Sequence, residues 1–411
     1  ASVEGENRET IQVEDIQDMI EQKLMAAGKF ILAKTYIIYR YTRELVRKAN
    51  TTDDSIMSLI SNSNKDVMEE NSNKNAYIAS TQRDLIAGEV SKDLTKRVLL
   101  PEKIVKAHKE GMIHFHDMDY FIQPIFNCCL INIGDMLENG TVMNGKLIES
   151  PKSFQVACTV VTQIISAVAS SQYGGQSVDV RHLGKYLRKS RDKFMAETQE
   201  KFKDTLSRED IEKIVEMRVD DELRSGVQTI QYQINTLMTT NGQSPFVTLF
   251  LYIDENNEYV DENVRIIEEI LRQRLDGIKN EQGVYITPAF PKLIYVLEED
   301  NIHEDSKYWY LTEIAAQCTA KRMVPDYISE KKMKELKVDA NGNGQCFPCM
   351  GCRSFLSPWK DENGNYKFYG RFNKGVVTIN LVDVALSSGG DMDKFWKIFD
   401  DRLELCYRAL M

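Results

Sequence analysis

The sequence predicts an α/β protein with a mostly parallel sheet. Short β-branched or aromatic segments recur along the chain, and segments of ten or more residues with helical apolar spacing separate them. Parallel strands need long crossover connections of this kind, which are usually helices. The expected strands are residues 126–133, 245–253, 283–297 and 376–382, and the expected helices are residues 151–171, 261–279, 307–322 and 392–410.

The composition is typical of a large globular protein. The chain has 411 residues, 42% hydrophobic and 28% charged, enough for one large domain or two to three ordinary ones. No apolar run reaches the ~18 residues that a membrane helix needs, and no signal segment is visible. The formal net charge of −10 argues against non-specific nucleic-acid binding. We therefore expect a cytoplasmic protein without a membrane or a direct nucleic-acid partner.

Eight cysteines in a chain of this length, without a secretion signal, predict reduced thiols. Cys346, Cys349 and Cys352 form the pattern C-x2-C-x2-C, in which thiolates three residues apart can converge on one metal ion. No second C-x2-C or H-x3-H pair offers a fourth ligand. Spacing alone therefore leaves a metal site, a catalytic thiol and inert thiols open. Three more cysteines lie on apolar helical stripes and are expected to be buried: Cys158, Cys318 and Cys406.

Two helices are expected at the start of the chain. Apolar residues recur at helical spacing over residues 12–27, which predicts an amphipathic helix that ends at Gly28. A second helix is expected over residues 29–48. Residues 49–76 are rich in Asn, Ser and Asp, which is typical of a linker with a short helix.

A histidine pair follows the next helical segment. Residues 84–110 have helical spacing that Gly111 ends, and residues 114–120 then alternate as a strand or an adjoining loop does. On a strand, His114 and His116 would share one face. With the two aspartates beside them, they fit half a metal site or a proton-handling group. They equally fit structural imidazoles that bond to backbone carbonyls.

Cys128 and Cys129 lie on the strand expected over residues 126–133. Successive side chains of a strand point to opposite faces, so only one of these thiols can face a given side of the sheet. The helix expected over residues 151–171 is nearly uncharged, and must be buried in this chain or against another subunit. Residues 181–240 are helical and heavily charged.

Six motifs together resemble those of the anaerobic (class III) ribonucleoside-triphosphate reductases. Residues 350–356, Met-Gly-Cys-Arg-Ser-Phe-Leu, are similar to the radical-cysteine loop of that family. Five more resemble its segments in the same order: Thr-Gln-Arg-Asp-Leu at 81–85, His-Phe-His-Asp at 114–117, Asn-Cys-Cys-Leu at 127–130, Ser-Gln-Tyr-Gly-Gly at 171–175 and Asn-Gly-Gln-Ser-Pro-Phe at 241–246. One such motif is weak evidence, whereas six in order are specific.

The resemblance implies that this chain is part of a ten-stranded α/β barrel of the glycyl-radical type. Residues 1–50 would be the helical end of an ATP-cone and its connector, and residues 51–411 an incomplete catalytic barrel domain. The nucleotide-binding front of the cone is not recognised, so no working ATP switch is expected. Residues from about 145 to 240 would hold the dimer interface and the specificity site.

The resemblance also implies the chemistry of single residues. Cys352 would become the transient thiyl radical that removes the ribose 3′-hydrogen, and Cys128 would serve the reductive half of the reaction from the opposite face of the sugar. Asn373 would lie near the substrate hydroxyls, where an asparagine can hold a hydroxyl but cannot act as a base. The other residues expected close to the substrate are His114, His116 and Ser354.

The ligands and partners implied by the resemblance are ribonucleoside triphosphates, dNTP and ATP effectors, formate or a thiol protein as reductant, a radical-SAM activating enzyme and a second copy of the chain. The candidate effector contacts are Glu149, Gln163 and Lys193. Solvated or helix-capping roles suit these three residue types equally well.

One part of the family pattern does not occur in this sequence. Family members carry a C-terminal glycyl-radical loop, preceded by a zinc module with paired C-x2-C motifs, and neither precedes Met411. We therefore expect the glycyl radical and the zinc to belong to a segment absent from this chain, which alone would be inactive. The alternatives are a non-catalytic zinc or iron–sulfur protein built on the cysteine cluster, a dimerising pseudo-enzyme scaffold, and another glycyl-radical enzyme such as a lyase.

Overall fold

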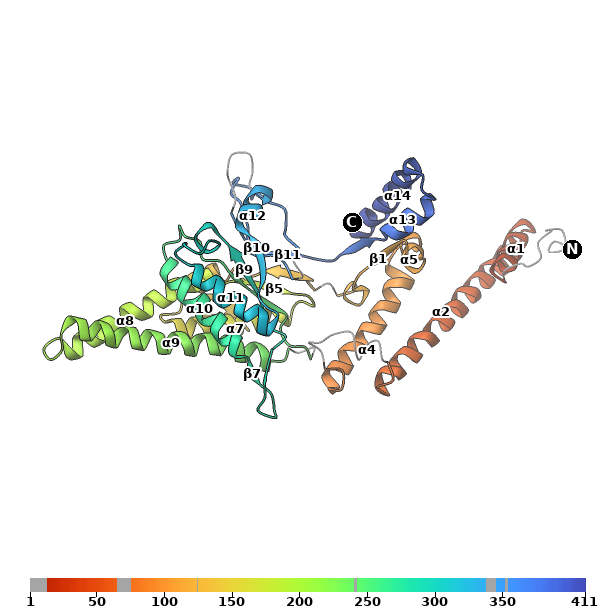
Figure 1. Cartoon of the computed structure of the whole chain (residues 1–411). Coiled ribbons are helices and arrows are strands. Elements are labelled where there is room, and N and C mark those ends of the chain that lie inside the picture. The colour runs from red at the N-terminus through yellow and green to blue at the C-terminus, as the bar shows by residue number, and fades with distance from the viewer. Residues whose placement is uncertain (1–12, 65–74, 124, 240–241, 338–344, 352–353) are drawn as a thin grey trace.

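The computed structural model describes residues 13–64, 75–123, 125–239, 242–337, 345–351 and 354–411, and describes only the backbone of Val13 and residues 44–51. Within these ranges the chain forms a large α/β body, a smaller unit built from segments distant in sequence, and an arm of two helices at the N-terminal end (Figure 1).

A six-stranded sheet forms the centre of the large body. Its strands, in spatial order, are Asp326–Ser329 (β10), Lys292–Leu297 (β9), Val247–Leu251 (β6), Gln176–Asp179 (β5), Cys128–Leu130 (β2) and Arg371–Asn373 (β11). The first five are parallel to their neighbours, and β11 pairs antiparallel with β2. The predicted α/β class with a mostly parallel sheet is therefore confirmed.

Helices connect these strands and cover one face of the sheet. They are Ile133–Glu138 (α6), Phe154–Ala169 (α7), Gly184–Phe202 (α8), Arg208–Thr236 (α9), Val260–Asp276 (α10) and Trp309–Arg322 (α11), with 3₁₀ turns at Val180–Leu183 and Glu299–Asn301. Alternate strand residues point toward them, so that Leu249, Leu251 and Leu293 are buried in one core with the helices. Cys158 and Cys318 are buried as predicted.

The nearly uncharged α7 is buried mainly within this chain. Its N-cap Ser153 accepts the backbone N–H of Val156, a cap that stabilises a helix by about 1 kcal/mol. Phe154, Val161 and Ile165 are fully buried. Val156, by contrast, is 49% exposed. The predicted burial is therefore confirmed for one side of the helix, and the other side faces solvent.

The opposite face of the sheet is filled by residues 345–351. This second core combines strand residues with residues of that segment: Leu130, Phe250, Ile294, Val296, Cys346, Phe347, Cys349 and Met350. Helix Glu330–Lys337 (α12), which follows β10, adds Met333. The packing holds the cysteine-containing segment beside the beginning of β2.

The N-terminal arm consists of Val13–Ala26 (α1) and Phe30–Ile60 (α2). Arg40 on α2 joins the two helices, because its guanidinium lies 2.7 Å from the carboxylate of Asp18 and 2.6 Å from that of Glu21. The first predicted helix is confirmed.

The second predicted helix is longer than expected. Residues 49–60, predicted as linker, continue α2, and residues 65–74 of that predicted linker lie outside the described residues. Apolar side chains continue at helical spacing through this part, and Leu59 is only 5% exposed. The composition rich in Asn, Ser and Asp therefore does not interrupt the helix at residue 49, and α2 ends only at Ile60.

The smaller unit joins early and late segments of the chain. It contains Ala79–Leu94 (α4), a π-helical turn at Thr95–Leu99, Glu102–Lys109 (α5), Ile113–Phe115 (β1), a 3₁₀ turn at Met118–Tyr120, Val377–Ile379 (β12), Leu381–Ser388 (α13) and Met392–Leu410 (α14). β1 and β12 pair antiparallel in a sheet of their own, so the strand predicted over residues 376–382 exists but does not belong to the main sheet. Cys406 on α14 is buried as predicted.

Two hairpins complete the described elements: Thr141–Met143 (β3) with Lys146–Ile148 (β4), and Ile278–Lys279 (β7) with Tyr285–Ile286 (β8). None of the helices in the described part of the chain combines the length and the apolar character needed to cross a membrane.

Candidate active site

Cys128 is the first residue of β2, and three segments converge on its sulfur. The backbone N–H of Gly175 donates to Cys128 Sγ at 3.3 Å, and the thiol donates to Asn127 Oδ1 at 3.0 Å. A Cβ on Gly351 would lie 2.7 Å from the same sulfur, closer than Cβ atoms approach other groups. The absence of a side chain at Gly351 therefore lets its backbone pack directly on the thiol.

Cys352, the predicted thiyl residue, and Arg353 lie outside the described residues, whereas Gly351 and Ser354 on either side are described. On one side, Gly351 contacts Cys128. On the other, Met350 and Ser354 form an antiparallel bridge with two backbone hydrogen bonds of 2.7 and 3.2 Å. Ser354 is exposed. Gly351, the described residue that precedes Cys352, is therefore held at the Cys128 end of β2.

Asn373 reaches the same position from β11. The register of the two strands sets it opposite Cys128, 245 residues away in sequence, and its Oδ1 accepts the backbone N–H of Cys128 at 2.7 Å. Its own carbonyl oxygen accepts the N–H of Asn127 at 3.0 Å. Two of the predicted catalytic residues are thus in direct contact.

Cys129 faces the opposite side of the sheet. Its thiol donates to Gln172 Oε1 at 2.9 Å and packs against the helix-side core, whereas Cys128 packs against the second core. The prediction that the two thiols point to opposite faces is confirmed. Burial, together with the neighbouring Cys128, raises the pKa of Cys129 to about 12, so this thiol is protonated at neutral pH.

Cys346 and Cys349 are both fully buried. Burial raises the pKa of the Cys346 thiol. Among the described residues, no group of three or more histidine, cysteine or carboxylate side chains is arranged to hold a metal ion.

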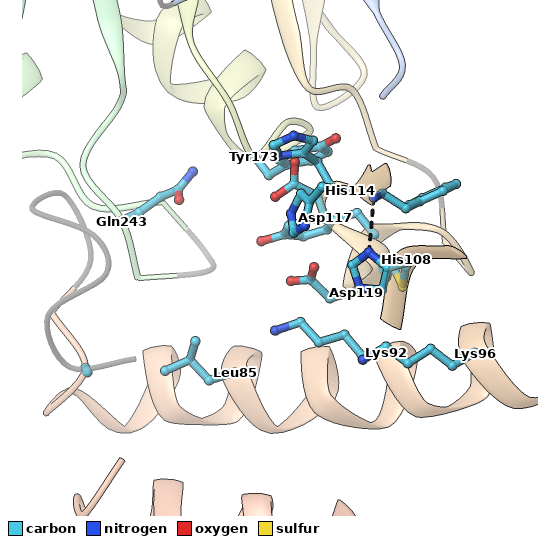
Figure 2. A pocket seen from close by; sticks show the side chains of 14 residues that line it. Leu85, Lys92, Lys96, His108, His114, Asp117, Asp119, Tyr173 and Gln243 are labelled. Carbon is cyan, nitrogen blue, oxygen red and sulfur yellow. Dashed lines mark hydrogen bonds between the residues drawn. The ribbon is translucent and has the colours of Figure 1, made fainter. Parts of the chain in front are cut away.

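A cavity of about 300 Å³ lies between α4 and the β1 region (Figure 2). It is lined by Ala76, Leu85, Lys92, Lys96, His108, His114, Phe115, His116, Asp117, Met118, Asp119, Tyr120, Tyr173 and Gln243. The rings of His114 and His116 lie edge to face with centroids 4.3 Å apart, as expected for two residues on one face of a strand. His108, which the sequence did not indicate, adds a third ring 5.1 Å from His114.

The outer two of these three imidazoles are neutral at pH 7. His108 Nδ1 accepts the N–H of Phe115 at 3.2 Å, so its proton is on Nε2. Burial and the neighbouring His114 lower the pKa of both His108 and His116. His116 Nε2 lies 2.8 Å from the Thr378 hydroxyl. These groups can therefore accept or pass on a proton, but they do not act as fixed cations.

Tyr173 connects the cavity with the thiol site. Its ring stacks on Tyr120 with centroids 4.3 Å apart and planes 3° from parallel. It directly precedes Gly174 and Gly175, whose backbone lies against Asn127 and the Cys128 sulfur. Burial and the nearby Asp117 carboxylate raise the pKa of Tyr173. Figure 2 shows His108, His114, Asp117 and Asp119 on one wall of the cavity. Lys92 of α4 and Lys96 of the π-helical turn that follows it lie opposite them.

The three predicted effector contacts are not assembled into a site by the described residues. Glu149 follows β4, Gln163 lies on α7 and Lys193 on α8, and all three are exposed. Within the described ranges no hydrogen bond or ion pair joins them, and Lys193 instead lies 3.9 Å from the carboxylate of Glu197. Their role remains a prediction.

A buried ionic network at the other end of the parallel strands was not anticipated from sequence. Asp179, at the end of β5, is fully buried, and it accepts hydrogen bonds from Arg181 and from the Tyr369 hydroxyl. Arg181 also lies 2.7 Å from Asp254, which follows β6. Although burial opposes ionisation, Arg181 lowers the pKa of Asp179. The network fastens the carboxyl ends of the two central strands, away from Cys128.

Comparison with protein families gives two matches. Residues 70–411 match the family described as anaerobic ribonucleoside-triphosphate reductase, and residues 1–45 match the family described as ATP cone domain. The anaerobic ribonucleoside-triphosphate reductase of Escherichia coli K12 is 36% identical over 417 aligned residues, which cover 100% of this chain and 56% of the relative. That of Enterobacteria phage T4 is 39% identical over 372 residues, covering 88% and 58%. The chain thus spans little more than half the length of these relatives.

Solved structures give the same grouping for the fold. The anaerobic ribonucleotide reductase of Thermotoga maritima with glycerol in its active site has a TM-score of 0.55 at 14% identity, covering 88% of this chain and 56% of that one. A second structure, of an anaerobic ribonucleotide reductase, has a TM-score of 0.54 at 14% identity, covering 97% and 59%. These likenesses support the barrel-type α/β fold. The matches as a whole favour the reductase interpretation over a metal-binding protein or a scaffold.

Proposed function

Because this chain belongs to the anaerobic ribonucleoside-triphosphate reductase family, we propose that it carries the thiol centre of an enzyme that reduces ribonucleoside triphosphates to deoxyribonucleoside triphosphates. The observation that carries the proposal is the convergence of Cys128, Gly351 and Asn373 at one point, from three segments distant in sequence. Cys352 directly follows Gly351 in the chain.

The chemistry needs a hydrogen-atom acceptor of matched bond strength. The 2′-hydroxyl is a poor leaving group, but a radical at the ribose 3′-carbon allows it to leave as water once it is protonated. A thiyl radical at Cys352 would take the 3′-hydrogen, so that the C–H bond breaks and an S–H bond forms. The overall change consumes two electrons and two protons. Formate, on oxidation to carbon dioxide, would provide two electrons and one proton, and solvent the second proton; alternatively, two thiols that form a disulfide would provide both electrons and both protons. The glycyl radical of the family, when present, would supply the oxidation of Cys352.

The polar groups around Cys128 suit a substrate hydroxyl. Asn373 Oδ1 already accepts the N–H of Cys128, so its carboxamide offers the substrate mainly its N–H donors. These donors can hold a ribose hydroxyl in place. They cannot remove a proton from it, and proton transfer is therefore left to other groups.

The histidine cavity would lie next to the substrate. His114 and His116 line this cavity, and Tyr173 connects it to the glycines beside Cys128. Lys92 and Lys96 supply the local positive charge that a phosphate-bearing ligand needs in a protein with a net charge of −10.

The remaining assignments rest on family membership. They are a homodimer, dNTP effectors bound near Glu149, Gln163 and Lys193, ATP as a second effector of such an enzyme, a radical-SAM activating enzyme, and zinc in the segment that relatives have beyond the matched part. Residues 1–45 match the ATP cone family, and the prediction that they form no working ATP switch stays a prediction. A cytoplasmic location fits such an enzyme.

The test is replacement of each thiol in the complete, anaerobically activated protein. Cys352→Ser and Cys128→Ser are each expected to lower deoxynucleotide formation by on the order of 10³-fold or more, because each removes a group that exchanges a hydrogen atom. Cys129→Ala, which removes the neighbouring thiol on the opposite face, is the matched control and should retain most activity. Nucleotide reduction by the Cys352→Ser protein would refute the assignment.

A further inference from the structure

The backbone of Asn127 is held by two hydrogen bonds, and its carboxamide packs against the Gly174 backbone. The N–H of Asn127 donates to the carbonyl of Asn373 at 3.0 Å, and its own carbonyl accepts the N–H of Gly174 at 2.7 Å. A Cβ on Gly174 would lie 2.3 Å from Asn127 Oδ1, so that only glycine leaves room for this amide group. The side chain is therefore wedged between the Gly174 backbone and the Cys128 sulfur.

The sulfur of Cys128 is in turn held between one donor and one acceptor. The Gly175 N–H donates to it at 3.3 Å, and its S–H points to Asn127 Oδ1 at 3.0 Å. The Gly351 backbone closes a third side. An amide oxygen accepts a hydrogen bond but cannot donate one. The hydrogen bond to Asn127 Oδ1 therefore exists only while the sulfur carries its hydrogen.

We propose that Asn127 is a positioning residue, whose carboxamide oxygen keeps the Cys128 thiol protonated and directs it in one rotamer beside Gly351. The proposal rests on the proposed role of Cys128, since a sulfur that exchanges a hydrogen atom must carry one. Gly175 acts in the opposite sense, because its N–H favours the thiolate.

Two variants of nearly the same shape separate this role from packing. Asn127→Leu removes this acceptor and keeps the Gly175 donor, so the pKa of the Cys128 thiol should fall by roughly half a unit to one unit. Asn127→Asp provides a stronger, charged acceptor, so the pKa should rise by about one unit or more. If Asn127 only filled space, both variants would leave the pKa unchanged or shift it in the same direction.

The pKa is read from the rate of iodoacetamide alkylation of Cys128 against pH, in the reduced 411-residue chain under anaerobic conditions, with peptide fragmentation to separate Cys128 from Cys129. Cys129 is the internal control, because its thiol donates to Gln172 on the other face. A pKa of the Cys128 thiol that rises from Asn127→Leu through the unmodified chain to Asn127→Asp supports the proposal. An unchanged pKa in both variants, or the reverse order, overturns it.

Circular dichroism checks that each variant folds. If Asn127→Leu does not fold, Asn127→Ser takes its place, because its shorter side chain withdraws the oxygen from the sulfur and should also lower the pKa. The alkylation measurement involves no nucleotide, so its outcome is independent of the activity test. The role of Asn127 can be refuted while Cys128 is still required for nucleotide reduction, and it can be supported even if Cys128 is not required.

Discussion

The carboxamide of Asn373 has two functional ends that substitution can separate. Asn373→Asp keeps an oxygen for the N–H of Cys128 but loses the donors proposed to hold a ribose hydroxyl. We expect kcat/KM of the complete enzyme to fall by roughly 10²-fold or more, with little change in the free energy of unfolding. Asn373→Ala should lower both kcat/KM and the free energy of unfolding. An Asn373→Asp enzyme with unchanged kcat/KM would show that the amide donors have no part in turnover.

Glu298 gives a pH-dependent prediction. Burial raises its pKa from 4.5 to about 8, although the N–H groups of Ile253 and Asp254 donate to it. Below about pH 4.5 the carboxyl is protonated in the folded and unfolded states alike. Between about 4.5 and 8 only the folded state keeps the proton, so stability falls as pH rises.

Urea unfolding of the chain and of Glu298→Gln at several pH values measures this effect. The difference in unfolding free energy between the two proteins should change in that pH window, with the unmodified chain losing stability relative to the variant as pH rises. Parallel curves from pH 5 to 8 would show that Glu298 has an ordinary pKa.

Single residues differ in how far sequence could reveal them. Motif resemblance indicated Cys128 and Asn373, and the structure brings them into contact. His108 was missed because it lies on a separate helix, and only the fold carries it to the histidine pair. Asn127 stood inside a recognised motif, but no spacing rule connects a carboxamide to the following thiol. Its role follows from three-dimensional contacts alone.

Among the elements, β5 shows why short polar strands escape prediction. Gln-Ser-Val-Asp has only one β-branched residue, yet all four residues of Gln176–Asp179 are buried. Each polar side chain has a tertiary partner, such as Ile165 O for the Gln176 amide and Cys349 O for the Ser177 hydroxyl. These bonds satisfy the Gln176 amide donor and the Ser177 hydroxyl, although Gln176 Oε1 has no hydrogen-bond partner among the described residues. The long apolar strands and helices, by contrast, were predictable from periodicity.

The entry into β5 gives a steric prediction. Gly175 does not need a positive φ, but a Cβ there would lie 2.6 Å from Gly351 Cα, which is backbone that cannot rotate away. Gly175→Ala should therefore destabilise the chain by about 1–3 kcal/mol. It should also push residue 351 away from Cys128.

The matched control is Gly375→Ala, where a Cβ would meet nothing within 4 Å. Urea midpoints of the two variants should differ, with only the first well below that of the unmodified chain. Equal midpoints would mean that the approach of Gly175 to Gly351 is looser than described.

On the scale of the whole molecule, the exposed side of α7 suggests where a second copy would bind. Val156 is 49% exposed on a helix without charged residues. If dimerisation uses this side, Val156→Lys should weaken it by about tenfold or more, because a buried charge is unfavourable. Analytical ultracentrifugation over a concentration series measures the change, with Val284→Lys on the β7–β8 hairpin, 58% exposed, as control. Equal dissociation constants would assign the interface elsewhere.

The overall topology was only partly accessible from sequence. Periodicity predicted alternating strands and helices, and hence parallel pairing. Periodicity could not show that β12 pairs with β1 outside the main sheet, because the sequence of a β-branched strand does not identify the strand it pairs with. The ten-stranded barrel came from resemblance and stays a prediction, whereas the described main sheet has six strands, with β10 and β11 at its edges.

The hydrogen bond from the Gly175 amide to Cys128 sulfur makes this backbone position a natural reporter. Sulfur is a weak acceptor, so the bond should loosen whenever the thiol is oxidised or forms a disulfide. The rate at which the Gly175 amide proton exchanges with deuterium would then report the redox state of Cys128 without an attached probe or a substrate.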